Sequence, residues 1–254
     1  MRHPSSLYKS KQDCFFKESR YPVTRRILRG GLSQSDGVMA KSARQQQIRS
    51  VLTRERLIQA TLDEIFEVGY HAATTQEIAV RASVSRGALL HHFPMRADIV
   101  LAAMEALLED GTRQIKAVAG ELQDGKVSLG DFVEFLWRLF SGRFFYLSLE
   151  MITEARNDTS LRERMIPVVK RFHDALDEIW LAFCDPQRRA PRQARIILNL
   201  TVCLMRGMGV QTVLRPEPGY YREMIESWKA VLPHIIDGAA GDIMFARPVI
   251  KESR

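Results

Sequence analysis

The spacing of apolar residues is the feature that most constrains the fold, because it follows a helical period over most of the chain. In the first such segment Ile58, Leu62, Ile65 and Phe66 recur at helical spacing, and Gly69 follows where a helix C-cap is expected. No segment alternates apolar and polar residues as a strand with one buried face does. The sequence therefore predicts an all-α protein of about nine helices without a sheet.

Capping residues, glycines and prolines indicate where these helices begin and end. Thr74 and Thr75 precede Gln76 and Glu77 in the pattern of a helix N-cap. Ser85 is expected to cap the third helix, and Pro94 requires that helix to end before it. The predicted helices run from Arg54 to about Gly69, from Thr75 to about Ala82, over Arg86–His92, from about Met95 to Gln123, and then over Ser128–Ser141, Arg143–Asn157, Ser160–Cys184, Pro191–Leu214 and Gly219–Ile236.

The positive charge of the chain is concentrated at its N-terminal end. Residues 1–50 hold eleven Lys and Arg against three Asp and Glu, a net charge of +8, and the remaining 26 against 27 give −1. Because this segment has no sustained apolar period, we expect residues 1–50 to form a disordered basic arm. A small helical domain over residues 51–98, a larger one over 99–238 and a tail over 239–254 are expected to follow.

Several classes of protein are disfavoured by the sequence. Cys14, Cys184 and Cys203 are widely separated and odd in number, which is typical of free thiols in a reducing compartment. The most apolar long stretch, Ile196–Leu214, contains Asn199 and an arginine, and no signal-peptide core follows the N-terminal charges. We therefore expect a cytoplasmic protein with no membrane span.

No signature of an enzyme stands out in the chain. It contains no nucleophile elbow, no P-loop, no dinucleotide-binding fingerprint after a strand and no spaced set of metal ligands. The neighbouring His91 and His92 point about 100° apart on a helix, so they do not form a metal site by themselves. Neither catalysis nor a cofactor or metal ion is expected.

Two short helices joined by the turn Ser83–Ser85 predict a helix-turn-helix, whose second helix enters the roughly 12 Å wide major groove of DNA. Leu89 and Phe93, four residues apart, are expected to face inward. The outward face of this helix carries Arg86, Gly87, Ala88, Leu90 and His91. An arginine such as Arg86 pairs with a guanine edge through two hydrogen bonds, and small residues let the backbone approach the bases.

About ten residues of this region occur in an order and spacing that resembles the TetR family of transcriptional regulators. They are Gly69-Tyr70, Thr74-Thr75, Ile78-Ala79, Val84-Ser85, Gly87, Leu89, His92-Phe93-Pro94 and Arg96. The resemblance covers roughly Arg54–Leu101. It implies an N-terminal helix-turn-helix domain that binds operator DNA, and a C-terminal helical domain that binds a small-molecule effector and forms a homodimer.

The resemblance also implies roles for single residues. The positions that match Thr75, Arg86, Gly87, His91 and His92 lie at the operator in this family, and the position that matches Arg96 holds a phosphate. Ser85, Ala88 and Leu90 complete the candidate DNA-binding set. Leu90 departs from the aromatic residue usual in the family, and we expect it to contact a thymine methyl instead. Met95 replaces the usual capping residue of the fourth helix.

A dimer is expected because one short helix contacts too few base pairs for specificity, whereas a two-fold dimer doubles them. The last two helices carry two apolar stripes, which are either the dimer interface or part of the monomer core. These stripes are Leu198, Val202, Met205 and Gly209 on one helix and Tyr221, Ile225, Trp228 and Leu232 on the other.

The effector pocket is implied by the resemblance, since aromatic and methionine stripes by themselves are typical of ordinary core. Glu150 and Arg206 lie in otherwise apolar stretches, where isolated burial of a charge is costly. The two side chains either pair with each other or one of them anchors a polar group of the ligand. The candidate ligand residues are Phe145, Glu150, Met151, Phe172, Met205 and Arg206.

The sequence as a whole predicts a ligand-released repressor that binds a palindromic operator as a dimer. The alternative is a helical protein-binding adaptor without sequence-specific DNA binding, which shares the apolar stripes. Salt-dependent binding to promoter DNA distinguishes the two hypotheses.

Overall fold

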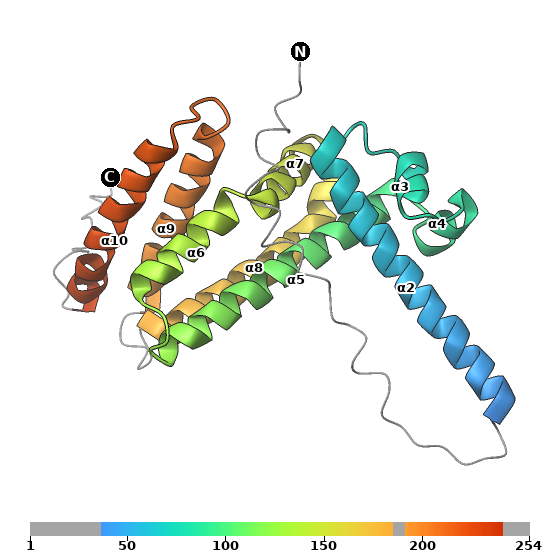
Figure 1. The fold of residues 1–254 in the computed structure, drawn as a ribbon, viewed down its shortest axis with the longest axis horizontal. Helices are drawn as coiled ribbons and strands as arrows, with labels where there is room; N and C mark the ends of the chain where they lie inside the picture. The colour runs from blue at the N-terminus through green and yellow to red at the C-terminus, as the bar shows by residue number, and fades with distance from the viewer. Residues whose placement is uncertain (1–36, 185–190, 241–254) are drawn as a thin grey trace, which may run out of the picture. The chain divides into compact units, whose positions relative to one another are not determined.

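A computed structural model describes residues 37–184 and 191–240, and these residues form nine α-helices and no strand (Figure 1). The all-α prediction is confirmed. The helices are α2 (Gly37–Val68), α3 (Thr75–Arg81), α4 (Arg86–His92), α5 (Arg96–Gln123), α6 (Leu129–Phe140), α7 (Arg143–Asn157), α8 (Thr159–Cys184), α9 (Pro191–Gln211) and α10 (Pro218–Ala240). They fall into two compact units, one ending at Ile99 and the other beginning at Val100, so the division lies within α5.

The first helix is longer than the sequence pattern predicted. α2 begins at Gly37, so the expectation of disorder is wrong for residues 37–50, while residues 1–36 lie outside the described residues. Residues 38–50 are rich in Ala, Lys, Arg, Gln and Met, which favour helix by intrinsic propensity even without an apolar period. The prediction that Phe66 faces the core is also wrong, because this residue is 44% exposed.

The first unit consists of α2, α3, α4 and the start of α5. Figure 1 shows α3 beside the C-terminal half of α2, with α4 following it. Gly69 ends α2 with a φ of 84°, and its N–H donates to the Ile65 carbonyl at 3.0 Å, as expected of a glycine C-cap. Side chains from all four helices form a common core, which includes Leu57, Ile78, Leu89 and Ile99.

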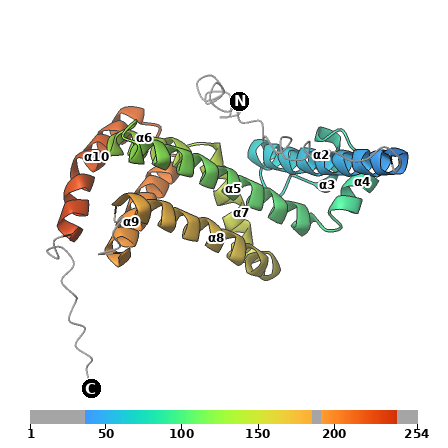
Figure 2. The same ribbon diagram turned by 90° about the horizontal axis from the view of Figure 1, so that it is seen from below.

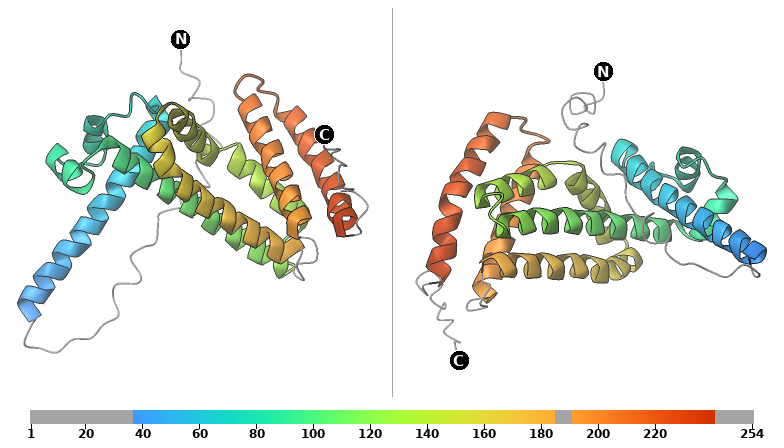
Figure 3. Two further views of the ribbon diagram at one scale, coloured as in Figure 1. Left: turned by 180° about the vertical axis from the view of Figure 1, so that it is seen from behind. Right: turned by 60° about the horizontal axis from the view of Figure 1, so that its bottom comes forward.

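The second unit is a bundle in which α9 packs against α6, α8 and α10, while α7 packs against α6 and α8 (Figures 2 and 3). Large aromatic side chains fill the spaces between these helices. Trp180 of α8 stacks on Phe132 of α6 with ring centres 6.0 Å apart, and Trp137 stacks on Tyr221 of α10 at the same separation. Burial of these rings supplies much of the apolar contact that holds the bundle together.

Gly209 allows α9 to lie directly against α6 and α7. A Cβ atom at this position would overlap the Phe140 carbonyl oxygen and lie 3.1 Å from Cε1 of Phe145. The Tyr146 hydroxyl secures the same contact from α7, because it lies 2.9 Å from the hydroxyl of Thr212. The C-terminal half of α9 is therefore held directly against the end of α6 and the start of α7.

Two further sequence expectations concern cysteines and membrane spans. Cys203 is a free, exposed thiol, whereas Cys14 and the side chain of Cys184 lie outside the described parts of the structure. Among the described helices, none combines the length and apolar content that crossing a bilayer requires.

Gly209→Ala is expected to destabilise the second unit by about 1–3 kcal/mol, the usual cost of overpacking a core. Urea unfolding followed by tryptophan fluorescence measures this change, because Trp137, Trp180 and Trp228 all belong to the second unit. Gly120→Ala in α5 is the matched control, since a Cβ there meets nothing within 4 Å. The control is expected to be neutral or stabilising. Equal stability of Gly209→Ala and the unmodified protein would contradict the required close approach.

Candidate nucleic-acid interface and ligand pocket

The helix α4 presents a polar face on a well-defined turn. Ser85 is its N-cap, and its hydroxyl accepts a hydrogen bond from the Ala88 N–H at 3.1 Å, as the sequence predicted. Leu89 and Phe93 are buried, which confirms the predicted inward face. The candidate residues of the outward face, Ser85, Arg86, Gly87, Leu90 and His91, are exposed, and Ala88 and His92 are half-buried. Seven of the nine predicted DNA-binding residues therefore lie together on α4 and its cap.

The turn between α3 and α4 has the hydrogen bonds of a helix C-cap. Ser83 has a φ of 55°, its N–H donates to Val80 O, and the next N–H, of Val84, donates to Ala79 O; both distances are 3.0 Å. These two bonds form a Schellman motif, which satisfies carbonyl groups at the end of α3. The turn thus fixes the direction in which α4 leaves α3.

An ion-pair cluster fastens α3 to α2. Arg81 of α3 contacts the carboxylates of Glu64 and Glu67 on α2, the second at 2.6 Å. Glu64 is buried, and the hydrogen bond with Glu67 is the main cause that raises the pKa of Arg81 above its ordinary value. Sequence reasoning missed this cluster, because charges fourteen or more residues apart give no periodic signal.

Arg96, the predicted phosphate contact, lies at the start of α5 and is half-buried against the loop before α3. Its Nε donates to the Ala73 carbonyl at 3.3 Å, and one terminal nitrogen donates to the Tyr70 carbonyl. The guanidinium also stacks on the Tyr70 ring, with 4.1 Å between its carbon and the ring centre. Arg96 therefore joins the loop to α5. The N–H donors that these two carbonyls do not use are the ones from which a phosphate would accept hydrogen bonds.

The structure shows how the N-termini of α3 and α5 are capped. Thr74, and not Thr75, caps α3 by accepting from the Glu77 N–H at 3.2 Å, while Thr75 is the half-buried first residue of the helix. At α5, where Met95 lacks a capping group, the carboxylate of Asp98 accepts from the Met95 N–H at 2.9 Å. Asp98 thus supplies one of the two bonds of a capping box.

His91 and His92 lie edge to face with ring centres 5.5 Å apart. Burial, followed by the nearby His91 and Arg54, lowers the pKa of His92 from its ordinary value. His92 is therefore a neutral hydrogen-bonding group at neutral pH. Within the described ranges, no three His, Cys, Asp or Glu side chains are close enough together to hold a metal ion.

A cavity of about 260 Å³ lies inside the second unit, among α5, α6, α7, α8 and α9. Its walls are mostly apolar, with an arginine, a histidine and a serine as polar groups. The lining residues are Met104, Leu108, Phe140, Phe144, Phe145, Ser148, Leu149, Ile152, Val169, Phe172, His173, Arg206, Gly207 and Val210. Ile152 and Val210 are 49% and 47% exposed, so the cavity opens to solvent beside them.

Three of the six predicted ligand residues line this cavity, namely Phe145, Phe172 and Arg206. Met151 and Met205 are completely buried core residues that do not line it. Glu150 is exposed on the outer side of α7, so the predicted pairing of Glu150 with Arg206 is wrong. The helical pattern around Glu150 is apolar on only one face, and Glu150 lies off that face.

Arg206, His173 and Ser148 supply the polar groups that line the cavity. Its guanidinium lies 5.2 Å from the centre of the Phe140 ring, and burial lowers the pKa of this arginine. Burial, and then the charge of Arg206, also lower the pKa of His173, whereas Asp177 and Asp174 oppose this shift. The Ser148 hydroxyl donates to the Phe144 carbonyl at 2.7 Å. The cavity consequently holds one positive charge among aromatic rings.

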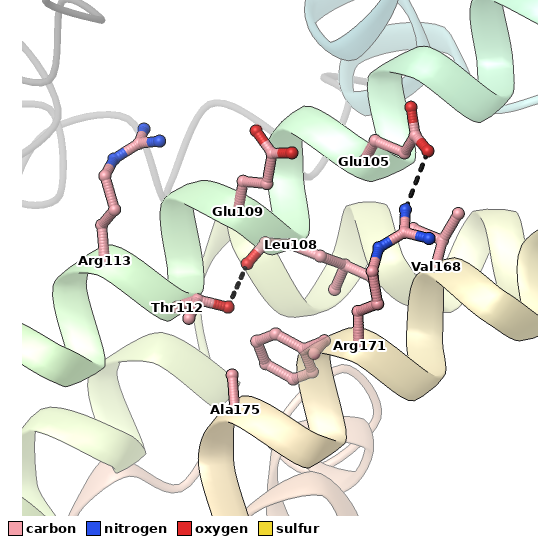
Figure 4. Close-up of a pocket in the computed structure, with 9 residues that line it drawn as sticks. Glu105, Leu108, Glu109, Thr112, Arg113, Val168, Arg171 and Ala175 are labelled. Atoms are coloured by element: carbon pink, nitrogen blue, oxygen red, sulfur yellow. Dashed lines mark hydrogen bonds and ion pairs between the residues drawn. The ribbon is translucent and has the colours of Figure 1, made fainter. Parts of the chain in front are cut away.

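A second hollow of about 350 Å³ lies between α5 and α8 and shares Leu108 and Phe172 with the first (Figure 4). It is more polar at its edges, where Arg171 and Glu105 form an ion pair at 3.0 Å. Figure 4 shows this pair spanning the two helices. The charge of Arg171 is thus balanced within the chain.

The predicted dimer stripes are buried within the single chain. The two stripes face the core of the second unit, which leaves them unavailable to a partner, and only Trp228 is half-buried. The seven buried residues of the stripes are Leu198, Val202, Met205, Gly209, Tyr221, Ile225 and Leu232. The prediction that they form a dimer interface is therefore wrong, because an apolar stripe on a helix does not reveal whether its own chain already covers it.

The last two helices also carry a second set of apolar residues that are exposed or half-buried, and sequence reasoning had selected only Trp228 among them. Leu200 is 51% exposed on α9 and Val231 is 47% exposed on α10. The full outer stripe is Ile196, Leu200, Cys203, Gly207 and Val210 on α9 with Met224, Trp228, Val231 and Ile235 on α10. α9 and α10 pack against each other in the bundle.

Residues 57–103 match the family model of the bacterial regulatory proteins of the tetR family. The HTH-type transcriptional regulator CymR of Pseudomonas putida is 29% identical over 175 residues, which are 69% of this chain and 86% of CymR. The uncharacterized HTH-type transcriptional regulator Rv2912c of Mycobacterium tuberculosis is 31% identical over 198 residues, which are 75% of this chain and 97% of that protein.

Solved structures show the same fold at lower identity. SCO1917, a member of the TetR family from Streptomyces coelicolor, is similar with a TM-score of 0.52 and 24% identity, covering 69% of this chain and 96% of its own. The multidrug binding protein EbrR in complex with malachite green has a TM-score of 0.52 and 22% identity, covering 72% of this chain and 96% of its own. The helix-turn-helix, the family match over it and the similarity to nearly the whole of Rv2912c together show that this chain belongs to the TetR family of DNA-binding transcriptional regulators.

Proposed function

We propose that this regulator binds a palindromic operator as a homodimer in the cytoplasm and is released from it by a small molecule that enters the cavity of the second unit. The observation that carries the ligand-controlled part is the cavity itself. It is lined by five helices, and one of them, α5, continues the chain from Arg96 in the first unit.

The exposed face of α4 is the proposed reading surface. Arg86 donates two hydrogen bonds to a guanine edge, while Gly87 and Ala88 allow the backbone to approach the bases. Leu90, 41% exposed, contacts a thymine methyl, and His91 contacts a neighbouring base or phosphate. Each of these side chains lies on the outward face of a helix whose inward face is fixed by Leu89.

The remaining candidate residues are proposed to contact the DNA backbone. Thr75 and Ser85 lie at the N-termini of α3 and α4, where positive helix ends attract phosphates. His92 is neutral and donates or accepts a hydrogen bond there, while Arg96 donates from the part of its guanidinium that the loop carbonyls leave over. These contacts orient α4 without reading sequence.

A second copy of the chain is the proposed partner of the outer stripe on α9 and α10. Two copies are required because recognition helices must enter major grooves about 34–36 Å apart to read a palindrome. The outer stripe offers apolar side chains on two adjacent helices, which is the arrangement needed for a four-helix interface.

Release follows from a two-state equilibrium. The ligand must bind better to a dimer whose α4 helices are spaced wrongly for the operator, since a ligand with equal affinity for both states shifts nothing. The proposed lever is α5, because it begins at Arg96 and lines the cavity with Met104 and Leu108. EbrR, a protein of the same fold, is a multidrug binding protein that has been crystallised with malachite green, which supports the assignment of a ligand-binding role to this domain.

Arg86→Ala is expected to weaken binding to the cognate operator by about 1–3 kcal/mol and to relax the base preference at one position in each half-site. The operator is first selected from a random duplex pool, and affinity is then measured by fluorescence anisotropy at fixed, near-physiological salt. Arg222→Ala, which removes an exposed arginine of α10, is the matched control. If Arg86→Ala and the unmodified protein bound every duplex equally well, direct reading by α4 would be ruled out.

Leu200→Glu is expected to weaken dimerisation by roughly 2 kcal/mol or more, the scale of an interface hot spot, because it places a charge in the outer stripe. Sedimentation velocity over a range of protein concentrations measures the monomer–dimer equilibrium. Ile166→Glu is the control, since Ile166 is 58% exposed on α8, outside the stripe. An undiminished dimer in Leu200→Glu, or an equal loss in the control, would reject the proposed interface.

A further inference from the structure

The cavity of the second unit contains a cation without a counter-charge. Arg206 lines it and lies 5.2 Å from the centre of the Phe140 ring. Among the residues that the structure describes, no carboxylate pairs with this guanidinium, and burial lowers its pKa. Removing a charge from water is costly unless another charge compensates, so this position is one that an anion from outside would stabilise.

The neighbouring hollow between α5 and α8 provides a direct contrast. There Arg171 is already paired with Glu105 at 3.0 Å, as the dashed line in Figure 4 shows. An anion that approached Arg171 would have to compete with that carboxylate. The uncompensated charge of Arg206 therefore distinguishes the two cavities, and it favours the apolar one as the anion site.

The other walls of the cavity define the rest of the ligand. Phe140 packs edge to face on Phe144 and on Phe145, with ring centres 5.9 and 6.3 Å apart, and Phe144 lies 5.9 Å from Phe172. Such a ring cluster accepts a further aromatic ring in offset or edge-to-face contact. The volume of about 260 Å³ is slightly below the range of about 300–1,000 Å³ usual for drug-sized ligands, so the ligand is small.

The number of positive charges in the cavity sets the number of negative charges that a ligand can carry there. His173 also lines the cavity, but it is neutral near pH 7, because burial and Arg206 both act against its protonation. One cation remains, which matches one carboxylate. A second carboxylate on the ligand would lie among apolar side chains without compensation.

We infer that the effector of this regulator is a small aromatic monocarboxylate, whose carboxylate pairs with Arg206 and whose ring packs among Phe140, Phe144, Phe145 and Phe172. This inference rests on the proposed ligand-controlled function and specifies the chemistry of its site. A neutral ligand would leave Arg206 uncompensated, and a cationic ligand would be repelled by it.

Isothermal titration calorimetry on the purified full chain, without DNA, tests the inference with matched probes. The first set is 3-phenylpropanoate, 3-phenylpropanamide and 3-phenylpropylamine, which differ only in charge at one end. The second is 2-naphthoate with 2-naphthamide. In each set the carboxylate is expected to bind roughly ten- to a hundredfold more tightly than the amide, the range of a hydrogen bond to a charged group. The amine is expected not to bind.

Arg206→Gln is expected to abolish the preference for the acid over the amide, while Arg171→Gln, in the neighbouring hollow, leaves it unchanged. Urea unfolding separates a ligand-binding role from a structural one. Arg206→Gln should be at least as stable as the unmodified protein, because it removes a buried charge that no described carboxylate balances. A clear loss of stability would assign Arg206 a structural role and overturn the inference.

Two other results would also overturn it: no carboxylate binding more tightly than its amide at millimolar concentration, or an acid preference that survives in Arg206→Gln. Operator release, measured separately, distinguishes this failure from failure of the proposed function. Carboxylate binding at Arg206 without any loss of operator affinity would contradict ligand control while leaving the site intact. Release by neutral or cationic compounds alone would retain ligand control and refute the carboxylate.

Discussion

The close approach of α9 to the end of α6 and the start of α7 is the constraint on which the second unit depends. Only a glycine at position 209 lets the helix lie against the Phe140 carbonyl and the Phe145 ring. That contact places Arg206, three residues earlier on α9, over the Phe140 ring, where it lines the cavity. It also fixes which face of α9 is inward and which remains for a partner.

The first unit relies more on ion pairs and hydrogen bonds than the second unit does. The short α3 and α4 helices offer few apolar contacts of their own, and the ion pairs of Arg81 with Glu64 and Glu67 hold α3 on α2. Arg96 binds the loop carbonyls of Tyr70 and Ala73, which connects the region before α3 to the start of α5. A DNA-reading helix must be held in a defined orientation, because base contacts require a fixed register on the duplex.

Local features were predicted well from the sequence. Ser85 caps α4, Gly69 ends α2 with a positive φ, and Leu89 and Phe93 face inward, because each depends on neighbours within one turn of a helix. Features that depend on residues far apart in the sequence were not predicted correctly. Glu150 lies on an exposed face instead of pairing with Arg206, and seven residues of the supposed dimer stripes are covered by helices of their own chain.

The helical class, the helix-turn-helix and the residues on its outward face could be predicted from the sequence, since helical periodicity and capping depend on residues three or four apart. Tertiary packing was needed to show which apolar stripe faces the core and which of the six candidate residues line the cavity. It was also needed to show that Arg206 lines the cavity without a carboxylate partner among the described residues. The physical reason is that burial and charge compensation are set by which helices pack together, and a helix pattern defines a face without defining its neighbour.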